Sequence, residues 1–264
     1  MRTGKRRDGI FTGWYGLVSL RETPLPSLWR MGEEVRIDVL LVHGIGKAIK
    51  SDYYNEFVDS IRRKMPLDSD IVFHPINYSE PLDSKEAVIF DWMKELNYQD
   101  LRSFGCFFVG DVLAYAPPEG VPGPGDFYYD VNNLLADKFA EIKAKYPESR
   151  KVIISHSLGT QISFSFAFKE ELDHLFVCGS PLLYFSIRFK DYGSYPPKLK
   201  GMTNFYNVND PVATVVGRNP KLAVCKDIHV KSWNPRYLLP LQAHGFYFKS
   251  NQVHQGIADV LKKL

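Results

Sequence analysis

The chain has 264 residues, a length typical of one large domain, or of one domain with insertions, rather than of a repeat array. Apolar residues make up 45% of the sequence and charged residues 24%, and 33 basic against 30 acidic side chains leave a net charge of +3; these values exclude intrinsic disorder and a strongly basic nucleic-acid binder. Cys106, Cys178 and Cys225 form no C-x-x-C pair, so neither a zinc cluster nor a disulfide framework is indicated, and no apolar run approaches the ~18 residues that span a bilayer.

The N-terminal segment, residues 1–34, carries the first signal along the chain. Lys5-Arg6-Arg7 and the apolar stretch 10–20 imitate a signal peptide, but a threonine and two glycines interrupt the stretch and no small-x-small cleavage site follows. We interpret the segment as an N-terminal arm or as edge strands, with secretion as the alternative. Because the cysteine pattern fits a reducing compartment, we expect a cytoplasmic protein. The absence of a long apolar run and the nearly balanced charge lead us to expect no integral membrane segment and no nucleic-acid partner.

The first strong pattern is a nearly continuous aliphatic run at residues 35–42, which ends at His43-Gly44. Such a run predicts a buried, central strand of a parallel sheet. Apolar residues then recur at spacings of three and four between residues 52 and 65, which predicts an amphipathic helix that ends at Pro66. Residues 71–76 predict a second strand, so the chain begins with the order strand, helix, strand.

The same alternation continues to the C-terminus. Helical spacing and short apolar runs predict helices at residues 131–146, 158–168 and 253–264, and strands at residues 152–154, 175–178, 205–208 and 228–230. Strands that alternate with helices indicate an α/β fold with a doubly wound, mostly parallel sheet that is covered on both faces. We expect one such domain over residues 35–264.

Two stretches, at about residues 79–126 and 182–200, interrupt the alternation and are interpreted as lid-like insertions. Loops of an open α/β sheet leave the carboxyl ends of strands, where ligands bind, so we expect these insertions to supply a lid and pocket walls. Residues 182–206 carry aromatic side chains at about twice the chain average of 14%. Tyr184 and Phe185 are the candidate substrate-binding residues among them, and simple packing of the insertion on the sheet is the alternative.

The pentapeptide Ser155-His156-Ser157-Leu158-Gly159 follows a predicted buried strand and opens a predicted helix. A serine in this context lies on a tight turn that presents its hydroxyl above the sheet, and small residues two positions before and after it let the strand and helix approach closely. Ser155 replaces the first glycine of the G-x-S-x-G pattern. The alternative is that a serine of this stretch only caps the helix.

A serine nucleophile needs a histidine base and a carboxylate, which on this kind of fold follow in the order Ser, Asp or Glu, His. Asp210, in Asn207-Val208-Asn209-Asp210-Pro211, closes a predicted strand and is the candidate acid, although an aspartate before proline is also an ordinary turn residue. His244, on a predicted loop before the last helix, is the candidate base.

Three other histidines compete with His244 for the role of base. His254 is predicted on the surface of the last helix, and His229 lies inside a weak predicted strand. His156 adjoins Ser157 and is expected to point away from it, because neighbouring side chains diverge on a tight turn. His244 therefore remains the best candidate.

Backbone amides that could stabilise an oxyanion are offered by His43-Gly44-Ile45-Gly46 and by the start of the helix after Ser157. Ile45 and Leu158 are the candidate donors, and His43 and Gly44 are further candidate substrate-binding residues. A phosphate-binding loop is excluded, because Leu41 and Ala48 stand where that pattern requires glycine and serine or threonine.

These segments together resemble an α/β-hydrolase of the serine lipase and esterase type over about residues 35–264. The resemblance rests on Leu40 to Gly46, Ser155 to Thr160, Cys178-Gly179-Ser180-Pro181-Leu182, Asn207 to Val212 and His244-Gly245-Phe246-Tyr247. It implies Ser157 as nucleophile, Asp210 as acid, His244 as base, and Ile45 and Leu158 as oxyanion donors. The sequence departs from the family pattern at Ser155, and its lid region matches no one subfamily.

We therefore expect a serine hydrolase that cleaves small-molecule or lipid carboxylic esters through an acyl-enzyme, with no metal and no organic cofactor. A non-catalytic binding module on the same fold and an acyltransferase with the same triad are the alternatives. The sequence carries no signal for an oligomeric state.

Overall fold

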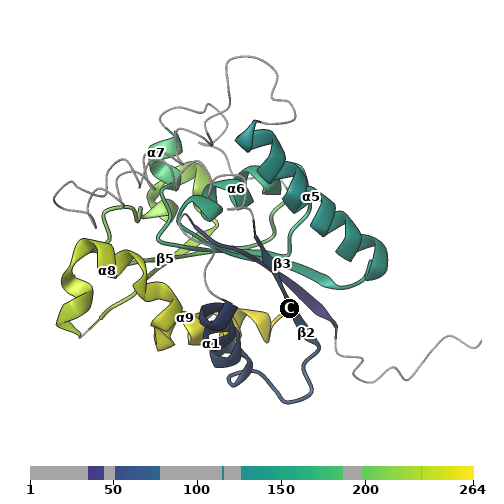
Figure 1. The fold of residues 1–264 in the computed structure, drawn as a ribbon, viewed down its shortest axis with the longest axis horizontal. Helices are drawn as coiled ribbons and strands as arrows, with labels where there is room; N and C mark the ends of the chain where they lie inside the picture. Colours follow the sequence, from purple (N-terminus) through teal and green to yellow (C-terminus); the bar gives the residue numbers. More distant parts are fainter. Residues whose placement is uncertain (1–34, 45–50, 78–114, 116–125, 187–197, 233) are drawn as a thin grey trace, which may run out of the picture. The chain divides into compact units, whose positions relative to one another are not determined.

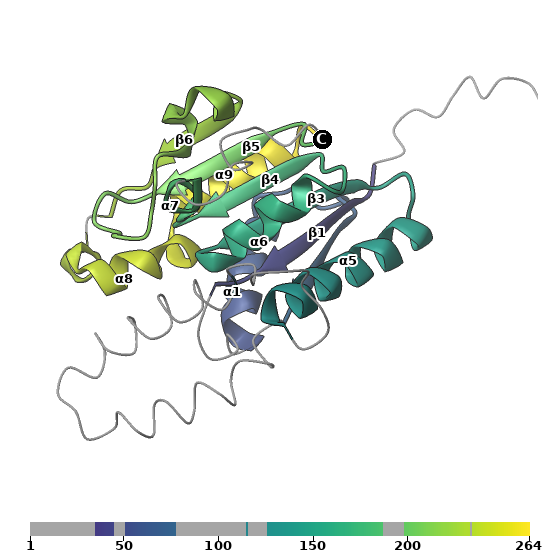
Figure 2. The same cartoon turned by 90° about the horizontal axis from the view of Figure 1, so that it is seen from above.

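The computed structural model describes residues 35–44, 51–77, 115, 126–186, 198–232 and 234–264, all of which lie in one compact unit, Glu34–Leu264. Its centre is a six-stranded sheet with the order β2-β1-β3-β4-β5-β6 (Figures 1 and 2). The strands are β1 Ile37–Val42, β2 Ile71–Ile76, β3 Arg150–His156, β4 His174–Cys178, β5 Met202–Tyr206 and β6 Cys225–His229. The α helices are α1 Ser51–Arg62, α5 Phe127–Lys145, α6 Leu158–Ala167, α7 Leu182–Ser186, α8 Pro240–His244 and α9 Asn251–Leu261.

All five strand pairings are parallel, which confirms the predicted α/β class with a doubly wound sheet. The register places Ile37 of β1 beside Ile71 of β2 on one side and beside Arg150 of β3 on the other. Because the strands run the same way, all their carboxyl ends meet along one margin, here named the carboxyl edge, and all their amino ends meet along the opposite margin, the amino edge.

Helices cover both faces of the sheet (Figure 1). Leu40 and Val42 belong to the apolar cluster that contains α5 and α6 residues, whereas Val39 and Leu41 belong to the cluster that contains α1 and α9 residues. Successive strand side chains point to opposite faces, so a strand buried on both faces is apolar at nearly every position. This explains why β1, in which Asp38 is the one charged residue, was recognisable as a nearly continuous aliphatic run.

Two predicted strands are displaced from their observed positions. The strand predicted at residues 205–208 is β5, Met202–Tyr206, in the structure. The strand predicted at residues 228–230 is β6, Cys225–His229. Four of the six missed residues are polar, namely Thr203, Asn204, Lys226 and Asp227. The Asn204 amide donates to Thr214 O at 2.8 Å and to the Asp227 carboxylate at 2.7 Å. These buried hydrogen bonds replace the apolar contacts that hydrophobic periodicity detects.

The C-terminal region corrects two further expectations. His244 was expected on a loop but is the last residue of the short helix α8, which begins at Pro240. His254 was expected on the surface of α9 but is 6% exposed, because its Nε2 hydrogen-bonds to Phe248 O at 2.8 Å and its ring packs edge-on against Phe57. A buried imidazole with a satisfied nitrogen behaves as a core residue.

Several expectations lie outside the described residues: the N-terminal segment 1–34, Ile45, and most of the insertions at 79–126 and 182–200. Of the second insertion the structure describes α7 and residues 198–200. Among the helices described, none combines the length and the apolar character that crossing a membrane requires.

Candidate active site

Ser157 occupies the turn between β3 and α6. Its backbone angles are φ 53° and ψ −129°, and it is the one non-glycine residue with positive φ among those described. Its side chain makes no capping hydrogen bond to α6, which argues against the helix-cap interpretation of this serine. The turn is tied to the next strand, because Ser157 N–H donates to Cys178 O at 3.0 Å. A strained serine held by neighbouring structure is typical of a functional turn.

Small residues make this turn sterically possible. A Cβ added to Gly159 would lie 2.2 Å from His43 O, and one added to Gly44 would lie 2.4 Å from the Ser157 Cβ. Ser155 fits at the position of the usual glycine because its hydroxyl is directed to β4, where it donates to Phe176 O at 2.9 Å. The departure from the G-x-S-x-G pattern is therefore accommodated by one buried hydrogen bond.

The structure brings the three candidate catalytic residues together at the carboxyl edge. His244 Nε2 lies 2.9 Å from Ser157 Oγ, and His244 Nδ1 lies 3.0 Å from each carboxylate oxygen of Asp210. A carboxylate only accepts hydrogen bonds, so the neutral imidazole carries its proton on Nδ1 and presents the lone pair of Nε2 to the serine hydroxyl. The arrangement can withdraw a proton from Ser157.

A parallel sheet, a strained serine between a strand and a helix, and the chain order Ser, Asp, His define a known architecture. The chain has the α/β-hydrolase fold. No protein-family model matches the chain, and no curated protein matches it.

A search of solved structures finds chains of low sequence identity. They include an α/β serine hydrolase homologue from Coxiella burnetii, at 10% identity and a TM-score of 0.45, with 88% of this chain and 86% of that chain covered. A dienelactone hydrolase from Anabaena variabilis has 14% identity and a TM-score of 0.46, with 88% and 86% covered. A thioesterase of the prodiginine pathway in Streptomyces coelicolor has 12% identity and a TM-score of 0.42, with 92% and 98% covered.

Asp210 both stabilises its own turn and hydrogen-bonds to the candidate base, His244. Its Oδ1 accepts from Val212 N–H at 2.9 Å, as in an ordinary aspartate turn, and its Oδ2 accepts from the Tyr247 hydroxyl at 2.7 Å. Burial alone would raise the pKa of Asp210, but hydrogen bonds from His244, Tyr247 and Val212 outweigh burial and hold the pKa below its usual range. The carboxylate is therefore ionised where the imidazole needs it.

His156 contacts the candidate base rather than the serine. Its Nε2 donates to the backbone carbonyl of His244 at 2.8 Å, and the two rings lie 4.6 Å apart. Burial, together with the charge of His244 when protonated, lowers the pKa of His156 to about 3, so this second imidazole is neutral at pH 7. The sequence showed only that His156 adjoins Ser157; its link to His244 crosses 88 residues and had no local signal.

Gly179 closes the site from β4. It has φ +57°, and a Cβ there would lie 2.9 Å from Asp210 Oδ2 and 3.2 Å from His244 Nδ1. Both facts demand glycine, since positive φ disfavours other residues and the acid and base leave no room. The resemblance to the family implied no role for Gly179, whereas its backbone conformation shows why glycine is required.

The remaining candidate residues have mixed environments. His43 is buried, and its Nδ1 contacts the carbonyl of Gly44. Tyr184 is half exposed and donates its hydroxyl to Pro211 O at 3.2 Å, whereas Phe185 is buried in the core. Leu158 provides the first amide of α6 directly after Ser157, and the first amides of a helix have no partner within the helix.

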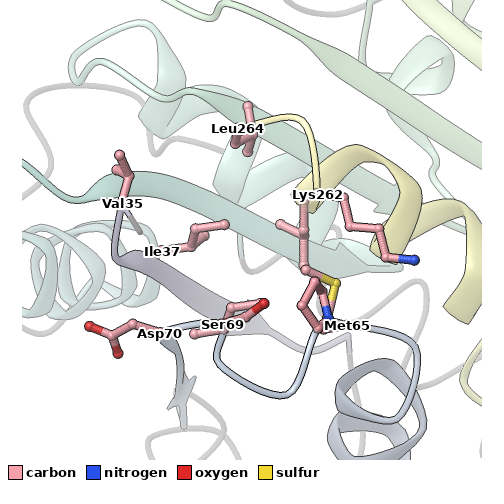
Figure 3. Close-up of a pocket in the computed structure, with 10 residues that line it drawn as sticks. Val35, Ile37, Met65, Ser69, Asp70, Lys262 and Leu264 are labelled. Atoms are coloured by element: carbon pink, nitrogen blue, oxygen red, sulfur yellow. The ribbon is translucent and has the colours of Figure 1, made fainter. Parts of the chain in front are cut away.

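A hollow of about 200 Å³ lies at the other end of the sheet (Figure 3). Its walls include Val35, Ile37, Ile71 and the C-terminal residue Leu264. Because Ile37 and Ile71 begin β1 and β2, this hollow belongs to the amino edge and is separate from Ser157. Within the described part of the chain, no cluster of histidine, cysteine and carboxylate side chains has the composition of a metal site.

Proposed function

We propose that this chain is a serine hydrolase that cleaves carboxylic esters through an acyl-enzyme on Ser157. One observation carries the proposal: His244 lies within hydrogen-bond distance of the Ser157 hydroxyl on one side and of both Asp210 oxygens on the other. Serine is a weak nucleophile until a base removes its proton, and a base acts well when its tautomer is fixed. The strained turn at Ser157 supports the same role, because it is maintained at the junction of β3 and α6.

In the acylation step, Ser157 Oγ attacks the ester carbonyl while its proton passes to His244 Nε2. Asp210 stabilises the imidazolium that results. The amide of Leu158 donates to the oxyanion from the start of α6, with Ile45 as the second proposed donor. The tetrahedral intermediate then collapses, the bond to the alcohol oxygen breaks, and His244 returns its proton to that alcohol.

In the deacylation step, water replaces the alcohol. His244 takes a proton from the water as its oxygen attacks the acyl carbonyl, and it returns the proton to Ser157 Oγ as the enzyme–acyl bond breaks. One ester and one water thus give one acid and one alcohol. The groups that move protons or stabilise charge in these steps are side chains and backbone amides of this chain.

A small-molecule or lipid ester with a short to medium acyl group is the proposed substrate. Tyr184 supports this proposal, because it presents an exposed aromatic ring on α7 and is tied by its hydroxyl to Pro211, the residue after the candidate acid. Aromatic side chains provide apolar area with little loss of conformational entropy, which suits an acyl group. Transfer of the acyl group to an alcohol instead of water is the second outcome that the same residues permit.

Labelling with a fluorophosphonate probe tests the proposed nucleophile. The probe reacts quickly only with an activated serine, so we expect rapid labelling of the wild-type chain at Ser157 and none in Ser157→Ala. Ser149→Ala is the matched control, since Ser149 is also a buried serine with a hydrogen-bonded hydroxyl, and it should label at the wild-type rate. Absence of labelling in the folded wild-type chain would favour the non-catalytic binding module instead.

A series of p-nitrophenyl esters of increasing chain length tests the substrate class. We expect release of p-nitrophenol that is abolished in Ser157→Ala, with kcat/KM greatest for short or medium acyl chains. Product analysis in the presence of an added alcohol separates hydrolysis from acyl transfer: free acid supports a hydrolase, and a new ester as the main product would contradict that assignment.

A further inference from the structure

A buried tyrosine touches the candidate acid, and no step of the proposed reaction employs it. Tyr247 lies in the 3₁₀ helix η6, Phe246–Lys249, and its side chain is fully buried. Its hydroxyl donates to Asp210 Oδ2 at 2.7 Å. Tyr247 follows His244 by three residues, so one short stretch of backbone supplies two donors, an imidazole and a phenol, to the same carboxylate.

The direction of the tyrosine proton is fixed by a second hydrogen bond. The backbone N–H of Asn207 donates to Tyr247 Oη at 3.0 Å. An amide N–H can only donate, so the phenol oxygen accepts there and its own proton is left for Asp210. Asn207 directly follows β5, which anchors the phenol to the end of the sheet. Tyr247 is therefore a donor with a set direction, unlike a surface hydroxyl that rotates freely.

The carboxylate of Asp210 is held at both oxygens. Val212 N–H occupies Oδ1, the Tyr247 hydroxyl occupies Oδ2, and His244 Nδ1 faces the two oxygens at equal distances of 3.0 Å. Rotation of the carboxylate away from the imidazole would break the bonds of Val212 and Tyr247 together. The surrounding space is closed as well, because a Cβ on Gly179 would lie 2.8 Å from the Tyr247 ring.

We infer that Tyr247 is a positioning residue of the proposed triad, whose hydroxyl holds the Asp210 carboxylate in the orientation that faces His244 Nδ1. The expected effect on kcat rests on the proposed function. The expected effect on the orientation of the Asp210 carboxylate rests on geometry alone. Without the hydroxyl, only Oδ1 of the carboxylate is held by a donor other than His244. The negative charge of Asp210 is then less offset by hydrogen bonds and interacts more strongly with the imidazole.

The electrostatics of the cluster agree with this role. Among the described residues, His244, Tyr247 and His156 are titratable groups that interact with Asp210, and the Cys178 thiol faces Tyr247. Burial and the neighbouring Asp210 carboxylate raise the pKa of Tyr247 well above its usual value, so the phenol keeps its proton and remains a donor at neutral pH.

The test compares wild type with Tyr247→Phe, which keeps the ring and removes the hydroxyl. On a p-nitrophenyl ester we expect kcat to fall about tenfold with KM within about twofold, because a displaced acid leaves the base misaligned. The acid limb of the kcat/KM profile should move to higher pH, since that limb reports protonation of the general base. In ¹H NMR spectra, the far-downfield resonance of the proton between His244 Nδ1 and Asp210 should be displaced.

Tyr115→Phe is the matched control, because Tyr115 is another buried tyrosine whose hydroxyl hydrogen-bonds, in this case to Asn132 of α5. It should lose stability without moving the acid limb or the downfield resonance. Incorporation of 3-fluorotyrosine at position 247, which strengthens the donor and keeps the packing, should displace that resonance in the opposite direction from Tyr247→Phe.

The NMR measurement requires no turnover, so it decides the role of Tyr247 even if fluorophosphonate labelling and ester hydrolysis both fail and the proposed function is lost. An unmoved resonance in folded Tyr247→Phe and in the fluorotyrosine protein, or an equal change in Tyr115→Phe, would overturn the inference.

Discussion

The sheet carries an aspartate, a histidine and a serine in hydrogen-bond contact at each of its two edges. At the carboxyl edge these are Asp210, His244 and Ser157. Near the amino edge, Asp38 of β1 contacts His74 of β2 at 2.8 Å and Ser149, which precedes β3, at 2.5 Å. Both clusters are largely buried and contain the same three residue types, yet their connections differ.

In the amino-edge cluster, Asp38, His74 and Ser149, the carboxylate stands in the middle. Asp38 accepts hydrogen bonds from His74, from Ser149 and from Arg36 at 3.0 Å. The Ser149 hydroxyl lies within donating distance of Asp38 Oδ2 and, at 3.0 Å, of Tyr146 O, and its oxygen accepts from the Lys151 ammonium at 2.6 Å. Burial would raise the pKa of Asp38, but the hydrogen bonds from Arg36, Ser149 and His74 hold it below its usual range.

The two clusters show that the order of contacts decides the chemistry. At the carboxyl edge the imidazole stands between serine and carboxylate, so it can take the serine proton and share the charge with Asp210. At the amino edge no imidazole nitrogen faces the serine in the hydrogen bonds described, and the positive charges of Arg36 and Lys151 surround the carboxylate. The first connection suits proton transfer, and the second ties strand ends together.

The largest expected effect separates the two serines. Ser157→Ala should lower kcat about 10³-fold or more while the far-UV circular dichroism spectrum and the unfolding midpoint stay close to those of wild type. Ser149→Ala should leave kcat within about twofold and lower stability, because the Lys151 ammonium and the Asp38 carboxylate each lose a partner. Equal kinetic loss in both variants would remove the distinction between the clusters.

Exchange of each aspartate for asparagine gives the next largest effect. Asp210→Asn should lower kcat about 10³-fold, because an amide can favour the wrong histidine tautomer. Asp38→Asn should leave the kcat of the folded protein unchanged but lower the free energy of unfolding by about 3 kcal/mol, since Arg36 and Lys151 lose the buried charge that they face. Denaturant titrations of both variants, beside their kcat values, check the pair; a stable Asp38→Asn protein would contradict it.

The two clusters also differ in how far the sequence predicted them. Ser157, Asp210 and His244 were recognisable because each follows a strand or precedes a helix whose apolar pattern places it at the carboxyl edge. Their contacts agree with that placement, while their catalytic roles stay a proposal. Asp38 carried no such signal, because it lies inside the aliphatic run of β1 and its partners His74 and Ser149 are 36 and 111 residues away along the chain.

The same limit explains the other residues that sequence patterns did not find. Tyr247 contacts Asp210 across 37 residues, and His156 contacts His244 across 88 residues. Periodicity does not encode contacts of this kind. The first residues of β5 and β6 were missed because polar side chains there, Asn204 and Asp227, hydrogen-bond to one another. Central apolar strands and the turn chemistry of Ser157 were predictable since they depend on neighbouring residues, whereas positioning contacts depend on the completed fold.

A smaller effect of pH should involve histidines at both edges. Burial lowers the pKa of His174, the first residue of β4, to about 4, as burial and His244 lower that of His156 to about 3. As pH falls below about 6.5, these histidines bind protons in the unfolded chain but not yet in the folded protein. The free energy of unfolding is therefore unaffected by them above about pH 6.5. Below that pH it declines by about 1.4 kcal/mol per pH unit for each histidine, down to about pH 4.

His174→Gln isolates the amino-edge contribution. We expect its free energy of unfolding to fall less between pH 7 and pH 5 than that of wild type, by about 2 kcal/mol, since one proton fewer is taken up on unfolding. Denaturant titrations at the two pH values measure this difference, and any constant loss of packing at His174 cancels from it. Parallel curves for the two proteins would show that His174 does not contribute.

The smallest expected effect concerns Tyr184 beside the carboxyl-edge cluster. Tyr184→Phe removes one hydrogen bond of a half-exposed hydroxyl to Pro211 O, so stability should change by about 0.5 kcal/mol or less. If the ring contacts the acyl group, Tyr184→Phe should keep the KM of a medium-chain p-nitrophenyl ester, whereas Tyr184→Ala should raise KM severalfold with kcat little changed. An equal KM in both variants would assign Tyr184 to the surface of α7 alone. A fall in kcat without a change in KM would instead place its influence on Asp210, through the adjoining Pro211, and would extend the positioning contacts of the carboxyl edge beyond Tyr247.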